Sequence, residues 1–254
     1  MASGEYMHGI LERRKVLKWL CKLLTGLFLA GFYPISRAKA KKLKLMILEG
    51  DSMKLPRPKT DGGMPLETCI KTRRTVRSFT PQPLRLEELS QLLWSAQGIT
   101  EENGYKRAAP SAGALYPIDV YAVLGPDSVE GLNGAVYQYL PATHAVKTIA
   151  KGDLRRKVAE ISLSQMWMAR APVIIVITAE YPRITVKYKR RGVRYAMIEA
   201  GHIGQNIFLQ AEALGLGAGI VGAFDDKKLI HVMEISGFQE PLLIMPVGHI
   251  KYPA

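Results

Sequence analysis

One short stretch holds three arginines and two hydroxyl side chains: Arg73, Arg74, Thr75, Arg77 and Ser78. An arginine presents a planar, permanently charged fork that matches two phosphate oxygens at once, and a hydroxyl adds a further donor. The stretch therefore predicts a site for a phosphate-bearing ligand. A basic turn that simply faces water is the alternative that these residues alone leave open.

A second stretch, residues 107–117, consists mostly of small residues and includes two prolines. Small side chains let a flat ligand lie against the backbone, and Ser111 with the amides of Ala112 and Gly113 could donate hydrogen bonds to it. Tyr116 can bury its ring and keep a polar tip. The stretch predicts one wall of a binding site, with an ordinary tight loop as the alternative.

Residues 183–195 combine six Lys and Arg with two tyrosines, between a predicted buried strand and a predicted long helix. Such a concentration of cations and phenols indicates the rim of an active site. A solvated loop would be equally basic, so that interpretation stays open.

Hydrophobic periodicity predicts the elements that must position these stretches. Apolar residues at helical spacing predict helices over residues 66–71, 84–98, 153–168 and 195–214. Alternation and β-branched runs predict strands over residues 118–124, 135–139, 173–177, 218–221 and 242–247, of which 173–177 should be central and buried.

Two further local patterns concern the C-terminal half. Gly222, Ala223 and Phe224 predict a sharp turn before a helix that starts at Asp225 and Asp226. Small residues within the long helix imply a close packing partner, because Gly costs about 1 kcal/mol there relative to Ala. His202 lies among apolar neighbours in the sequence and is interpreted as structural.

The net charge of +13 is concentrated at the N-terminus, where residues 1–59 hold 13 Lys and Arg against 4 Asp and Glu and so carry +9. A nucleic-acid-binding domain should carry its charge on its own folded face, so no nucleic acid is expected as a partner. The two cysteines, Cys21 and Cys69, are too few for a disulfide scaffold and show no metal-ligand spacing, so no metal site is predicted. Residues 41–63 have the basic, Pro- and Gly-containing composition of a linker, and the folded domain is expected at 64–254.

Residues 1–40 have the order of a targeting segment. The paired Arg13 and Arg14 precede an uncharged run of 14 residues, 23–36, and residues 38–40 offer a small-x-small cleavage site. The run is shorter than the roughly 20 residues that span a bilayer. The segment resembles a twin-arginine export signal, which predicts a location outside the cytoplasm. A retained membrane anchor and a cytoplasmic tail are the alternatives.

The ordered motifs resemble those of the nitroreductase-like FMN enzymes, and more closely their SagB-type dehydrogenase branch, known for oxidising thiazolines and oxazolines in peptide natural products. The resemblance covers about residues 67–251 and depends on residues 73–77, 109–117, 191–195, 199–202, 205–206 and 222–224. It implies an α+β fold, a three-layer sandwich in which a mixed, mainly antiparallel sheet is flanked by helices. It also implies an interlocked homodimer with one FMN in each of two clefts between the subunits.

The resemblance assigns cofactor-binding roles to twelve residues. Those near the FMN phosphate and ribityl chain are Arg73, Arg74, Thr75, Arg77, Gly248, His249 and Lys251. Those near the isoalloxazine are Pro110, Ser111 and Ala112 beside the ring, and Gly222 or Ala223 with a backbone amide that faces flavin N5.

Lys187 and Tyr188 match a Lys-Tyr pair that the azoline-oxidising members use near the substrate. The resemblance makes Lys187 the candidate base and Tyr188 an orienting donor. To act as a base, Lys187 would need burial or neighbouring cations that favour its neutral form.

The activity that the resemblance implies is an FMN-dependent oxidoreductase that transfers hydride between flavin N5 and a small or peptide-borne substrate. A second hypothesis is an NAD(P)H-dependent nitro or quinone reductase on the same fold. A hypothesis of another class is a membrane-associated binding protein with a vestigial flavin site. The export signal departs from the azoline-oxidising members, which work beside cytoplasmic cyclising partners.

Overall fold

The computed structural model describes residues 52–101 and 104–251, which belong to one compact unit. The predicted export signal, its cleavage site and the first part of the predicted linker lie outside these residues. Within the described part, no helix is both long and apolar enough to cross a membrane.

A seven-stranded sheet forms the centre of this unit, with strand order β1-β4-β3-β2-β5-β7-β6 and antiparallel pairing between neighbours. The strands are β1 (Ser52–Lys54), β2 (Ile118–Leu124), β3 (Ala135–Leu140), β4 (Ala145–Lys151), β5 (Val173–Ala179), β6 (Gly217–Ala218) and β7 (Glu240–Gly248). All five predicted strands are present, although the one predicted over 218–221 is reduced to the short β6. The strands β1 and β4 were not predicted.

β5 lies inside the sheet between β2 and β7, as its unbroken β-branched run predicts. Ile175 and Ile177 belong to one hydrophobic core, whereas Ile174 and Val176 belong to the other. Successive strand side chains point to opposite faces, so the sheet separates two cores.

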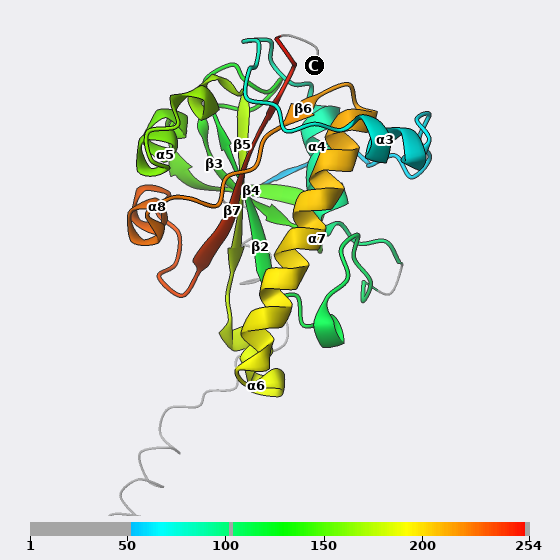
Figure 1. Cartoon of the computed structure of the whole chain (residues 1–254), viewed down its shortest axis with the longest axis vertical. Helices are drawn as coiled ribbons and strands as arrows, with labels where there is room; N and C mark the ends of the chain where they lie inside the picture. The colour runs from blue at the N-terminus through cyan, green and yellow to red at the C-terminus, as the bar shows by residue number, and fades with distance from the viewer. Residues whose placement is uncertain (1–51, 102–103, 252–254) are drawn as a thin grey trace, which may run out of the picture. The chain divides into compact units, whose positions relative to one another are not determined.

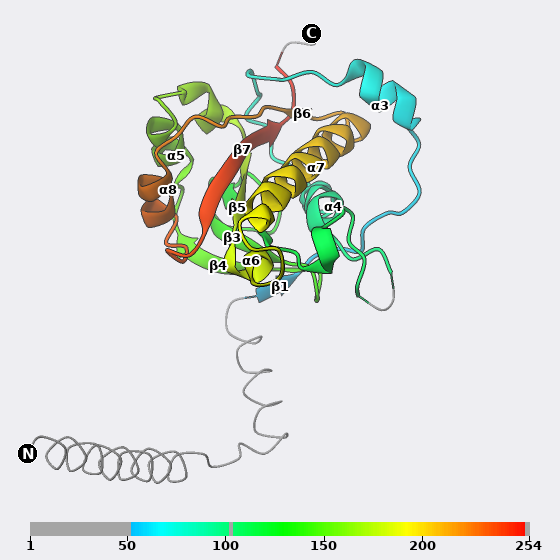
Figure 2. The same cartoon turned by 60° about the horizontal axis from the view of Figure 1, so that its bottom comes forward.

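Helices cover both faces of the sheet and give the expected three-layer sandwich (Figures 1 and 2). α4 (Leu86–Gln97) and α7 (Arg191–Ala213) pack on one face, and α3 (Leu66–Thr72) packs against α7. α5 (Arg155–Ile161), α8 (Asp226–Val232) and the short 3-10 helix η2 (Met166–Arg170) cover the other face. Cys69 is buried on α3.

The single helix predicted over residues 153–168 is wrong. α5 ends at Ile161, and Leu163 and Ser164 then adopt left-handed backbone with φ of 55° and 56° before η2 begins. L-residues rarely continue a right-handed helix through such conformations. The apolar periodicity continues across this break because η2 buries Met168 in the same core as α5.

A helix that the sequence did not predict, α6 (Pro182–Tyr188), lies in the basic region before α7. Pro182 occupies the first turn, where its fixed φ suits a helix and its missing N–H costs nothing. The predicted rim of cations and phenols is therefore a helical corner instead of a loop.

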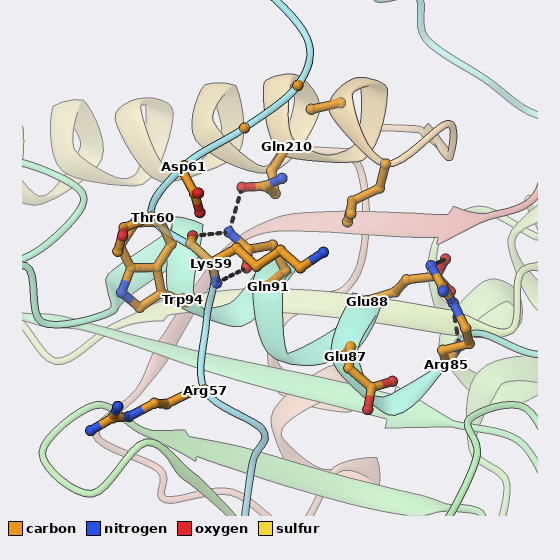
Figure 3. A pocket seen from close by; sticks show the side chains of 14 residues that line it. Arg57, Lys59, Thr60, Asp61, Arg85, Glu87, Glu88, Gln91, Trp94 and Gln210 are labelled. Atoms are coloured by element: carbon orange, nitrogen blue, oxygen red, sulfur yellow. Dashed lines mark hydrogen bonds and ion pairs between the residues drawn. The ribbon is translucent and has the colours of Figure 1, made fainter.

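The folded unit begins earlier than the expected boundary at residue 64. β1 pairs with β4, and the Leu55 side chain joins the core beneath α4 and α7. The Gln91 side chain then fastens the following segment: its Oε1 accepts from Lys59 N at 2.8 Å, and its Nε2 donates to Lys59 O and Gln210 Oε1, each at 3.0 Å (Figure 3). Composition missed this because the stabilising partners lie on distant helices.

Candidate active site

The arginine stretch runs along the edge of the sheet beside the C-terminal end of the chain. Val76 N donates to Ala218 O at 2.8 Å, and Thr80 N donates to His249 O at 2.9 Å. Lys251 N donates to Ser78 O at 3.1 Å. The two distant segments that were predicted to share a phosphate site are therefore neighbours in space.

The three arginines of this stretch have different environments. The guanidinium of Arg73 lies over the Phe208 ring at 5.4 Å, and that of Arg77 lies over the Trp167 ring at 5.8 Å. Arg74 is exposed, and its Nη1 donates to the carbonyls of Lys71 and Arg73, each at 2.9 Å. Arg73 and Arg77 are held against aromatic rings, whereas Arg74 mainly caps its own helix.

Two buried polar atoms beside this stretch have no hydrogen-bond partner within the described part of the chain: Thr80 Oγ1 and His249 Nε2. Burying a polar atom without a partner is costly, so such atoms commonly meet a ligand or water. Thr80 and Lys251 also line a pocket of about 620 Å³, together with Arg170, Asp127 and Arg155, of which Arg155 is paired with Asp153 at 2.7 Å. None of Arg73, Arg74 and Arg77 lines this pocket. These donors suit an anionic group such as a phosphate. Thr80 belongs to the same basic stretch, three residues after Arg77, but was given no cofactor-binding role.

The predicted ring-flanking stretch forms a tight turn that contains the short helix η1 (Ala112–Ala114). Gly113 adopts φ of +64°, which suits its lack of a side chain. Tyr116 N donates to Ser111 Oγ at 3.0 Å and closes the turn. The small residues thus produce a compact turn in which Pro110 is exposed and Ser111 and Ala112 are partly exposed.

Lys187 and Tyr188, at the end of α6, lie against this turn. A Cβ placed on Gly113 would come within 2.8 Å of Tyr188 Oη and 2.9 Å of Lys187 Nζ. Tyr188 also packs edge-on against Tyr195 at 5.2 Å between ring centroids. The structure thus brings the predicted catalytic pair to the predicted ring-flanking turn. The Lys187 side chain is exposed in this chain, so the burial that its role as a base would require is not present here.

The predicted glycine turn follows β6 and leaves its backbone open. Gly222 and Ala223 are exposed, and no heavy atom lies within 4 Å of a Cβ placed on Gly222. Val221 is fixed by reciprocal backbone bonds with Ile244, of 2.8 and 2.9 Å, and Asp225 caps α8 by accepting from Lys228 N at 3.0 Å. The turn is therefore anchored on both sides while its amides remain accessible to a flat ligand.

The candidate residues form two groups at opposite ends of α7. Arg73 lies near Phe208, whereas Lys187 and Tyr188 lie next to the start of the helix at Arg191 (Figure 1). At 1.5 Å per residue, roughly 25 Å of helix separates Arg191 from Phe208. No hydrogen bond, ion pair or ring contact between described residues joins the two groups directly.

His202 is exposed on α7, so packing within this chain does not support its interpretation as structural. Its neighbours in sequence point to other faces of the helix, since successive residues are rotated by about 100°.

Across residues 52–101 and 104–251, no group of three His, Cys, Asp or Glu side chains could hold a metal ion.

A pocket of about 470 Å³ lies between residues 57–63, α4 and α7, and contains none of the predicted site residues (Figure 3). Its lining is mainly polar or charged, and the hydrogen bonds of Gln91 cross its floor. The candidate site therefore does not coincide with this pocket.

The family model described as "Nitroreductase family" matches residues 70–249 of this chain. The chain belongs to the nitroreductase family. It is 40% identical over 199 residues to a candidate nitroreductase of Methanocaldococcus jannaschii, a match that covers 78% of this chain and 98% of that protein. It is 26% identical over 172 residues to the microcin B17-processing protein McbC of Escherichia coli, covering 66% of this chain and 63% of McbC.

A solved structure shows the same fold. The crystal structure of a candidate nitroreductase from Ralstonia eutropha superposes with a TM-score of 0.70 at 29% identity, covering 80% of this chain and 90% of that one. This nitroreductase-family chain is thus an oxidoreductase, and the resemblance to the SagB-type branch agrees with its similarity to McbC.

Proposed function

We propose that this protein is an FMN-dependent oxidoreductase of the SagB type that exchanges hydride with a small or peptide-borne substrate. The observation that carries the proposal is the contact of Lys187 and Tyr188 with the turn at Gly113, because it places a basic and a phenolic group beside the predicted ring-flanking wall. When bound, FMN would supply the ring that accepts or donates the hydride.

Residues of this chain would bind the phosphate, contact the ring and act on the substrate. Arg73 and Arg77, with Thr75, would hold the phosphate, because the backbone of their stretch lies beside the segment that also brings His249 and Lys251. The open amides of Gly222 and Ala223 would donate to the ring edge. Lys187 Nζ would accept a proton from the substrate, and Tyr188 Oη would donate a hydrogen bond that orients it.

We infer a homodimer from the position of these groups. A mononucleotide is shorter than the stretch of α7 that separates the arginine stretch from the Lys187–Tyr188 pair, so one chain cannot offer both groups to one cofactor. Met197 and Ile198 on α7, and Leu66 and Ile70 on α3, are each about half exposed. Apolar side chains gathered on exposed helices suit a subunit interface, and a second copy would complete each site.

The absorption spectrum of the purified protein tests the cofactor, and anaerobic reduction followed by reaction with azoline peptides tests the substrate class. Lys187→Met and Tyr188→Phe should retain bound flavin and lose turnover. A wild-type protein that stays colourless after addition of FMN would overturn the proposal.

A reductase fed by NAD(P)H is the second candidate, and the similarity to the M. jannaschii protein favours it. It would use the same site residues with a nitro-aromatic or quinone as acceptor. Steady-state turnover with NADPH and menadione, compared with turnover of azoline peptides, separates the two candidates. An absence of quinone turnover would remove this one.

We also propose that residues 1–40 direct export by a twin-arginine-like route, on the strength of Arg13, Arg14 and the apolar run that follows them. That route carries folded proteins and so suits an enzyme that acquires its cofactor inside the cell. Replacing both arginines with lysine should retain the precursor in the cytoplasm. Equal export of the wild type and the Lys-Lys variant would contradict this proposal.

A further inference from the structure

A buried carboxyl group lies behind the ring-flanking turn and has no role in the function proposed above. Glu199 is on α7 and is 1% exposed. Gln97 on α4, also 1% exposed, donates from Nε2 to Glu199 Oε1 at 3.0 Å. Glu199 Oε2 is buried and has no hydrogen-bond partner among the residues that the structure describes.

Arg107, at the start of the turn, extends this arrangement. Its Nη1 donates to Gln97 Oε1 at 3.3 Å, so the amide of Gln97 stands between the cation and the acid. Its guanidinium lies 4.1 Å from the centroid of the Tyr116 ring, and its Nε is buried without a partner in the described part of the chain. Burial lowers the pKa of Arg107.

The Ser111 hydroxyl on the turn lies near the acid. Ser111 Oγ accepts a hydrogen bond from Tyr116 N at 3.0 Å, so the O–H of Ser111 is still available as a donor to another group. Burial raises the pKa of Glu199, while nearby Ser111, Gln97 and Arg107 lower it in part. Asn206, further along α7, holds the same turn by donating from Nδ2 to Ala108 O at 3.2 Å.

We propose that Glu199 is the positioning residue of the ring-flanking turn, and that its protonation state sets how firmly residues 107–117 are held against α7. When ionised, the carboxylate would accept from Ser111 and attract Arg107, which draws the turn toward the helix. When neutral, it would release the Ser111 hydrogen to a ligand. That the ligand is FMN depends on the proposed function.

The groups that face Glu199 come from two sides. α4 contributes Gln97, and the turn contributes Arg107 and Ser111. Charges that act on Arg107 come from Tyr116 and from Asp119 and Tyr139 on the neighbouring strands. Because Arg107 is a cation that acts on this acid, a change in its position is the expected consequence of protonation.

The test is hydrogen–deuterium exchange of the apo protein over residues 107–117, followed by mass spectrometry at several pH values and corrected for the intrinsic exchange rate. In the wild type, protection of this segment should increase about tenfold as Glu199 ionises, since a hydrogen bond to a charged acceptor is worth at least that factor. Glu199→Gln should show the same protection at every pH. The matched control is Glu212→Gln on the same helix, which should follow the wild-type profile.

Protection in Glu199→Gln that follows pH as in the wild type, or wild-type protection independent of pH, would overturn the proposal. Ser111→Ala provides a second route, because it removes the hydroxyl that could donate to Glu199; it also removes the acceptor of Tyr116 N, so protection should be lower than in the wild type at every pH. This variant should also show protection that does not change with pH.

FMN affinity, measured by fluorescence quenching, separates the two proposals. A wild type that binds no FMN but shows the pH-dependent protection contradicts the proposed function alone. FMN binding with a flat wild-type profile contradicts only the role of Glu199.

Discussion

Replacing Gly113 with alanine tests how the Lys187–Tyr188 pair is positioned. The φ of +64° at Gly113 is left-handed, which costs an L-residue about 1–2 kcal/mol, and the reduced entropy of the unfolded chain returns roughly 0.4–1 kcal/mol. The new Cβ would also lie 2.8 Å from Tyr188 Oη and 2.9 Å from Lys187 Nζ. Both atoms are the far ends of flexible side chains, so they can move away at little cost in stability.

We therefore expect Gly113→Ala to lower the free energy of unfolding by about 1 kcal/mol, which corresponds to a Tm decrease of ~2–4 °C for a unit of this size. We expect kcat/KM to fall by about tenfold to a hundredfold, because displacement of a reacting group by about 1 Å has effects of that order. Thermal unfolding and steady-state turnover with NADPH and menadione, or with an azoline peptide, measure the two quantities separately.

Gly131→Ala is the matched control. Gly131 also has a left-handed φ, of +77°, but no heavy atom lies within 4 Å of its Cβ position. It should show a similar decrease in Tm and an unchanged kcat/KM. Equal losses of kcat/KM in the two variants, or no loss in Gly113→Ala, would refute the reasoning that the turn positions the pair.

Three further predictions address other parts of the site. Arg77→Ala should weaken FMN binding by about tenfold or more, measured by fluorescence quenching, whereas Arg74→Ala should have a smaller effect because that side chain caps its own helix. Burial raises the pKa of Glu199, so the stabilising contribution of this residue is complete below its unfolded pKa and is lost as pH rises through the folded pKa. The Tm of Glu199→Gln should therefore rise relative to that of the wild type between these two pKa values. A Tm difference that stays constant with pH would contradict this prediction. Gly201→Arg should leave the Tm of the isolated chain unchanged, since a Cβ on Gly201 meets nothing within 4 Å in the chain itself. The same variant should be monomeric in sedimentation experiments, and a dimeric variant would argue against an interface at α7.

Much of the fold could be predicted because the residues that define it are close in sequence. The β-branched run of β5 and the alternation of β2 identify strands, and the apolar spacing of α4 and α7 identifies helices. The convergence of the arginine stretch with His249 and Lys251 was predicted only through the resemblance to a family. No local pattern indicates that residues about 170 positions apart pair through backbone hydrogen bonds.

The predictions failed where tertiary contacts decide the conformation. The apolar pattern of residues 153–168 continues through a break because two separate short helices bury their side chains in one core. β1 pairs with β4, and Leu55 is buried in a core that distant strands and helices form. Neither fact has a signature in the local sequence, since Pro and Gly around them favour a linker.

The small residues of α7 show how the two kinds of information combine. The sequence implies close partners for several of them without saying where the partners are. A Cβ on Gly204 would touch Leu243, Ile220 and Met245 at 3.5–3.7 Å, so packing within the chain explains that glycine. Gly201 faces open space beside the exposed Met197 and Ile198. Gly within a helix lowers stability relative to Ala, so a helical Gly is expected where close packing requires it. Because Gly201 has no such packing partner within its own chain, we infer that it contacts another molecule. The exposed face of α7 and the division of the site between its two ends therefore support the same proposal, a second copy that completes each site.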